Sequence, residues 1–225
     1  MAFRGSNEKI GDRENGNFLG SIELLSKHNS ILKEHVEKVK AAQSRGERLQ
    51  VHYLSSRSQN EFIHSCANLV KSRILEEREE AKYYSIMVDG TPDVSHKEQT
   101  TFILRYLTKN DGVYEVQERF LEYFDCCKKS GSDIADIIFK VLDKNNIPLD
   151  DCRGQGYDNA ANMSGAYKGV QSIIKTHNPL CIYSPCGCHS LNLCGADSAE
   201  CCDDATSFFS VVQSTYNLFA SSPQR

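Results

Sequence analysis

The chain has 225 residues, of which 40% are hydrophobic and 25% are charged, and its formal net charge is −4. This length permits one substantial core with a smaller helical part, and the acidic balance excludes a protein that coats DNA through bulk positive charge, so any DNA contact must be local. No apolar run approaches the roughly 18 residues of a membrane span, and the first residues lack the apolar core of a signal peptide, so we expect a chain that is neither secreted nor associated with a membrane.

The N-terminal region is predicted to be helical. Residues 1–16 are rich in glycine, asparagine and charge and indicate a loose lead-in. From Asn17 onward, apolar residues recur at spacings of three, four and seven, which predicts one or two amphipathic helices. A polar interval at 42–48 precedes a further helix after Ser58, whose acidic end at 76–80 is interpreted as solvent-exposed. We assign residues 1–80 to this helical region.

A sheet is predicted to begin the second region, residues 81–225. The segment 83–89 is apolar after Ser85, which is typical of a strand covered on both faces, and a turn at 90–93 is expected to end it. Residues 99–107 form a second predicted strand, and 110–112 (NDG) supply the residues that a hairpin needs before a return strand at 114–124. The sheet therefore opens as an antiparallel meander of three strands.

A helix and a crossover are expected next. Ser130 offers a hydroxyl cap, and the isoleucine, valine and leucine residues from Ile134 to Leu142 keep helical spacing. Residues 145–148 (NNIP) end this helix, and a short strand follows at 155–158. Such a crossover places the new strand parallel to a neighbour, which we expect to be the first strand.

The remaining predicted elements complete an α/β fold. A helix begins after Asn162 and stops near 177–179, a fifth strand covers 181–184, and a final helix covers 204–220. The fold class is thus a mixed five-stranded sheet, three antiparallel strands and then two parallel ones, flanked by helices. The chain stops without the pattern of a finished domain, so we expect it to be truncated at the C-terminus.

Two acidic residues are placed where such sheets bind ligands. Asp89 closes the first strand and Asp158 closes the fourth, and the carboxyl ends of parallel neighbours meet at one edge. A metal site between them is conceivable. The alternative interpretation is that both are turn residues, since Asp89 precedes a glycine and Asp158 precedes Asn159 and can cap the following helix.

The ten cysteines indicate free thiols rather than a disulfide framework in a chain that is not secreted. Cys186, Cys188 and His189 invite a zinc interpretation, with further cysteines nearby at Cys181, Cys194, Cys201 and Cys202. Two clean Cys-x-x-Cys pairs are missing, so zinc is the disfavoured interpretation. The simplest assignment for the others, Cys66, Cys126, Cys127 and Cys152, is core or surface thiols.

Several motifs together resemble one family. They are 3–5 (FRG), 16–19 (GNFL), 88–99 (VDGTPDVSHKEQ), 154–158 (GQGYD), 162–165 (NMSG) and 185–193 (PCGCHSLNL). In these motifs the chain resembles the catalytic region of hAT-superfamily transposases, and the expected order of elements matches the ribonuclease H-like fold of that family. The matching positions include Gly154, Gln155, Asn162 and Ser164, and Cys186 with His189 match a Cys-x-x-His motif of the catalytic core. Gly154 and Gly156 are expected to serve backbone geometry.

The resemblance implies an Asp-Asp-Glu triad that holds two Mg²⁺ ions and cuts and joins DNA strands. Carboxylates suit Mg²⁺, and a metal pair can activate the attacking oxygen and stabilise the leaving one. Asp89 and Asp158 match the first and second acids. The third acid, a glutamate far downstream in the family, has no match in this sequence. Glu200 is the candidate to replace it as a ligand, and this interpretation is disfavoured.

We weigh three hypotheses. The first is a truncated or domesticated transposase-like domain without independent catalysis, which retains binding of metal, DNA or protein. The second is an active transposase subunit completed by an acid supplied elsewhere. The third is a protein-interaction or self-associating module, using the helical prelude or the tail, in which both Asp residues are relics. A nuclear location follows from the resemblance alone.

Overall fold

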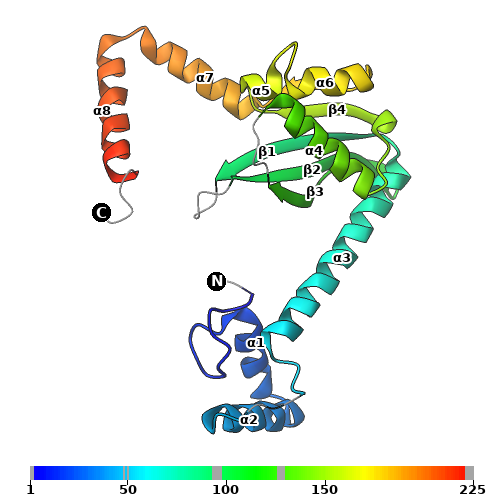
Figure 1. Cartoon of the computed structure of the whole chain (residues 1–225), viewed down its shortest axis with the longest axis vertical. Helices are drawn as coiled ribbons and strands as arrows, with labels where there is room; N and C mark the ends of the chain where they lie inside the picture. Colours follow the sequence, from blue (N-terminus) through cyan, green and yellow to red (C-terminus); the bar gives the residue numbers. More distant parts are fainter. Residues whose placement is uncertain (1–2, 48, 50, 93–97, 126–129, 221–225) are drawn as a thin grey trace. The chain divides into compact units, whose positions relative to one another are not determined.

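The computed structural model describes residues 3–47, 49, 51–92, 98–125 and 130–220. The motif residues 93–97 and the thiols of Cys126 and Cys127 lie outside the described residues. The chain divides into two compact units, Met1–Arg73 and Ile74–Arg225 (Figure 1). No described helix is long and apolar enough to cross a membrane.

The first unit contains α1 (Gly16–Ser26), α2 (Ser30–Ser44) and the first part of α3 (Ser56–Ala81). The Asn29 side chain accepts a hydrogen bond from the Leu32 N–H and so caps α2. A small core gathers residues at the predicted helical spacing with others from the loops: Ile10, Leu19, Val36, Val39 and Leu54. The expectation of one or two amphipathic helices here is confirmed, and two form.

The second unit is built on a five-stranded sheet in the order β3-β2-β1-β4-β5. Its strands are β1 (Tyr84–Pro92), β2 (Glu98–Asn110), β3 (Val113–Asp125), β4 (Cys152–Tyr157) and β5 (Ile182–Pro185). The first three pair antiparallel, whereas β4 is parallel to β1 and β5 is parallel to β4. The predicted mixed sheet and the expected parallel neighbour are both confirmed.

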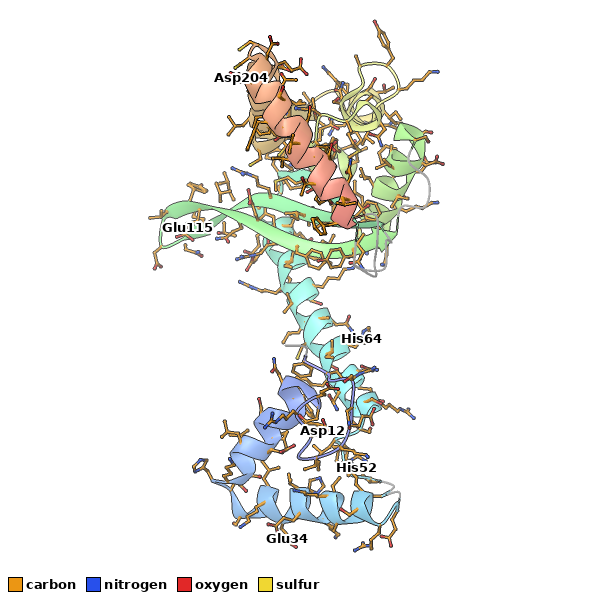
Figure 2. The ribbon with its side chains drawn as sticks, turned by 90° about the vertical axis from the view of Figure 1, so that its left-hand side faces the viewer. Asp12, Glu34, His52, His64, Glu115 and Asp204 are labelled. Carbon is orange, nitrogen blue, oxygen red and sulfur yellow. The ribbon has the colours of Figure 1, made fainter. Side chains whose placement is uncertain are left out.

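The strand bounds differ from the prediction at functionally relevant places. The turn expected at 90–93 is wrong for its described part, because Gly90 pairs with Thr100 on β2 and the strand continues to Pro92. The fourth strand begins earlier than expected and ends at Tyr157, so Asp158 is the first residue beyond it. Figure 2 shows Glu115 near the tip of the long β2–β3 hairpin, whose turn has positive φ at Asp111 and Gly112.

The helices of the second unit are α4 (Gly131–Lys144), α5 (Ala161–Ser164), α6 (Val170–His177), α7 (Gly187–Glu200) and α8 (Asp203–Ala220), with a short 3₁₀ turn at Leu149–Asp151. Ser130 caps α4 as predicted, accepting a hydrogen bond from the Asp133 N–H. The single helix expected after Asn162 is wrong. Two pieces form instead, because the linking residues 165–169 contain two glycines, which are weak helix formers.

One face of the sheet is buried under helices. In β1, Tyr84, Ile86 and Val88 are buried, whereas the alternating Ser85 and Met87 are half-buried and Asp89 is exposed. The expectation of a strand covered on both faces is therefore wrong. α4 lies across the sheet (Figure 1), and its apolar side joins the core through Ile134, Ile138, Val141 and Leu142.

Replacing a core residue of α4 should destabilise the second unit. Ile138 is fully buried, so we expect Ile138→Ala to lower the free energy of unfolding by about 2–5 kcal/mol. Ile182 on β5 is 72% exposed, and the same change there should cost less than about 1 kcal/mol. Urea unfolding of both variants measures the difference, and equal losses would contradict the assigned core.

Candidate functional site

Asp89 and Asp158 follow equivalent positions on adjacent parallel strands. The register pairs Ser85 with Gly154 and Met87 with Gly156, and each acid comes two residues after the last of these partners. Side chains alternate between the faces of a strand, so Asp89 shares a face with Ser85 and Met87, whereas Asp158 is the first residue beyond β4. The parallel pairing thus places two acids that are 69 positions apart in the chain after equivalent register positions.

The two carboxylates differ in their surroundings. Asp158 is half-buried, and its Oδ1 accepts a hydrogen bond from the Ala160 N–H at 3.2 Å, which shapes the turn into α5. Asp89 is exposed and pairs with Thr101 on β2 through its backbone. Asp158 is therefore a turn residue as well as an edge carboxylate, and the two interpretations made from the sequence are compatible.

Gly154 on β4 allows this strand to approach Ser85 on β1 closely. A Cβ at Gly154 would lie 2.6 Å from Oγ of Ser85, closer than real Cβ atoms approach other atoms. Gly154 does not have positive φ. Its role is close approach between β4 and β1, which keeps the two acid-bearing strands in contact.

The start of α7 is fixed to the same edge. The Cys186 N–H donates to the Tyr157 carbonyl at 2.8 Å, so the helix begins beside the end of β4. The Asn159 amide donates to Oγ of Ser190 at 3.1 Å, and the Tyr183 hydroxyl donates to the Asp158 carbonyl at 3.1 Å. Sequence reasoning missed Asn159, Tyr183 and Ser190, although Asn159 and Ser190 each adjoin a residue that it had selected.

Cys186 and His189 form an interacting pair in the first turn of α7. Hydrogen bonding to the His189 backbone and side chain lowers the pKa of the Cys186 thiol. The bond from Cys186 raises the pKa of His189, and the negative charges of Asp158 and Asp89 raise it further. Both acids are therefore close enough to act electrostatically on one imidazole, and the edge gathers four of the predicted residues.

The other predicted motif residues support the backbone around this edge. Gln155 is buried, and its amide donates to the carbonyl groups of Gln171 and Cys181. Oγ of Ser164 is within hydrogen-bond distance of the Asn159 and Ala160 carbonyls, which holds the turn after Asp158. Asn162 lies in α5, directly after that turn.

The remaining acids and thiols are spread along α7 and α8. Glu200 ends α7, eleven residues after His189, which is roughly 16 Å along a helix. Four exposed cysteines lie on or between these helices: Cys188, Cys194, Cys201 and Cys202. Within the residues that the structure describes, no three His, Cys, Asp or Glu side chains are grouped so that they could hold a metal ion.

Comparison with known proteins identifies a family that matches most of the chain. Residues 1–169 match the family described as ZMYM1/FAM200, RNase-like domain. The chain belongs to this family. The match includes β1 and β4 with both edge acids, and the ribonuclease-like fold expected from the resemblance is confirmed.

Individual relatives of the ZMYM1/FAM200 RNase-like domain are distant. The 52 kDa repressor of the inhibitor of the protein kinase from Homo sapiens is 22% identical over 174 residues, which is 76% of this chain. The Mus musculus protein of the same name is 21% identical over the same share. The chain spans 22% of the length of each relative.

The Cys186–His189 pair gives a direct electrostatic prediction. Because the Cys186 side chain is the largest cause of the raised His189 pKa, Cys186→Ser should lower that pKa toward its ordinary value. The stabilised form is the imidazolium, so the wild-type ring should keep its proton to a higher pH than the variant. NMR titration of the His189 ring protons measures both values. His177, which lies on α6, serves as the internal control, and an unchanged His189 pKa would contradict the pairing.

Proposed function

We propose that the second unit is a domesticated transposase-like domain that binds a divalent cation at Asp89 and Asp158 without cutting DNA by itself. The donor set favours Mg²⁺, since two carboxylates are hard oxygen ligands of the kind that this ion takes together with water. When bound, the ion would supply a Lewis acid for a phosphate oxygen or a water molecule.

The proposal is supported above all by the register of β1 and β4. Two acids that follow equivalent positions on adjacent strands form a local negative field that a cation would relieve. Both acids raise the pKa of His189, so this field favours the protonated form of its ring. A bound divalent cation would interact with the same two carboxylates, so it would disfavour protonation of the His189 ring.

Within residues 1–225, two acids match the metal ligands implied by the resemblance, and we propose that these two alone hold an ion without cutting DNA. In two-metal catalysis both the attacking and the leaving oxygen are stabilised, which requires more ligands than two carboxylates provide. The downstream acids Asp197 and Glu200 lie on α7 beyond its first turn. We therefore assign the edge to binding, with at most one ion held by Asp89 and Asp158.

The proposed partners are DNA or another protein, and the proposed location is the nucleus. The relatives are called repressors of a kinase inhibitor, a regulatory description that is compatible with either partner. With a formal net charge of −4, DNA contact would have to be local, and a metal ion at the edge would reduce the repulsion of phosphate there.

Removing either acid should weaken cation binding. We expect Asp89→Asn or Asp158→Asn to lower the affinity for Mn²⁺, used as a spectroscopic substitute for Mg²⁺, by at least about tenfold, or about 1.4 kcal/mol. Asp111→Asn is the matched control, because it removes the same charge in the β2–β3 turn and asparagine tolerates positive φ. Electron paramagnetic resonance titration measures free Mn²⁺. Equal affinities in all four proteins would make both Asp residues relics.

A plasmid assay tests the absence of catalysis. With Mg²⁺ or Mn²⁺ present, the wild-type chain should nick supercoiled plasmid no faster than the Asp89→Asn and Asp158→Asn variants. Agarose gels quantify the relaxed form. Nicking that requires both acids would instead identify an active subunit with a complete site.

A further inference from the structure

Two buried thiols face each other beneath the crossover that joins β4 to β5. Cys152 begins β4 and Cys181 directly precedes β5, and the two Sγ atoms are 3.5 Å apart. Both residues are fully buried, and neither forms a disulfide. They lie at the opposite end of the two strands from Asp158 and Cys186.

The backbone around this pair is held rigidly. The buried Asn178 side chain donates to the carbonyls of Leu149 and Cys152, each at 2.8 Å, and accepts from the Leu180 N–H. The Gln155 amide donates to the Cys181 carbonyl. These contacts fix the segments on both sides of the two thiols, so the sulfur atoms remain neighbours.

The two thiols are chemically unequal. The hydrogen bond between the two thiols lowers the pKa of Cys152, whereas the same bond and burial raise the pKa of Cys181. The Arg153 guanidinium lowers the pKa of Cys152 further. Either sulfur can donate in the contact between the two thiols, and the Cys152 thiol also donates to the Gly154 carbonyl at 3.3 Å. The lower pKa favours Cys152 as the nucleophilic cysteine and Cys181 as the resolving one.

We propose that Cys152 and Cys181 are a redox-active dithiol that closes to a disulfide when a hydroperoxide reaches it. The Cys152 thiolate attacks one peroxide oxygen, the O–O bond breaks, and a sulfenic acid forms with release of water or an alcohol. The Cys181 sulfur then attacks the sulfenic sulfur, the S–O bond breaks, and the sulfenic hydroxyl leaves as water with the proton of the Cys181 thiol. Two thiols are oxidised by two electrons, and the peroxide takes up both electrons and both protons.

Little movement is needed for this step. A disulfide requires the sulfur atoms to approach to about 2.05 Å, so each has to shift by less than about 1 Å from its present place. The new bond would close a loop that contains α5 and α6, and would tie the start of β4 to the start of β5. Asp158 follows the end of β4 and Cys186 follows the end of β5, so the disulfide would restrict the movement of the two strands that lead to these residues.

Peptide mapping of the wild-type chain tests the proposal without any variant. After treatment with hydrogen peroxide, free thiols are alkylated in denaturant, and the protein is cut with trypsin and chymotrypsin, which cleave after Arg153 and Tyr183. Mass spectrometry should find a linked pair of peptides containing Cys152 and Cys181, which a reductant separates. Recovery of both as alkylated peptides, with links only among the surface cysteines, would overturn the proposal.

Variants add a second readout. Oxidised wild-type protein should melt several degrees above its reduced form, because the bond restricts the unfolded chain. Cys181→Ser should lose this rise, whereas Cys194→Ser, which alters an exposed thiol on α7, should keep it. An equal rise in the Cys181→Ser variant would assign the stabilisation to another pair and contradict the proposal.

Discussion

The parallel pairing of β1 with β4 is the contact on which the candidate site depends. It is made by a crossover through α4, whose buried face packs on the sheet and whose end is fixed by neighbouring contacts. The Tyr84 hydroxyl donates to the Pro148 carbonyl at 3.0 Å, and Arg78 donates to the Asn146 carbonyl at 3.3 Å. These bonds hold the α4–β4 connection against α3 and β1. A shift of one residue in the pairing would turn one acid to the buried face.

The edge combines negative carboxylates with one basic ring. Asp89 lies in β1 and Asp158 directly follows β4, whereas His189 lies in a helix whose N-cap residue, Cys186, is bonded to the end of β4. In this arrangement the acids and the Cys186 side chain favour the protonated form of the ring. A bound cation would favour the neutral ring, so proton and metal occupancy at the edge should be linked.

Apolar periodicity and turn residues, which are local signals, were sufficient to predict the five strands and α4, whereas the helix α7 was not predicted. Three features required the three-dimensional structure. β1 runs past Asp89 to Pro92 because β2 supplies partners; the helix expected after Asn162 forms as two pieces, α5 and α6; and the bonds of Asn159 and Tyr183 join distant segments. The same holds for Cys152 and Cys181, which no spacing rule connects.

We propose that one divalent cation binds between the side chains of Asp89 and Asp158, and anomalous diffraction from crystals of the chain soaked in Mn²⁺ can locate it. A manganese peak is expected in contact with a carboxylate oxygen of each residue, near the start of α7. Manganese bound elsewhere, or carboxyl groups directed to opposite sides of the sheet, would contradict it.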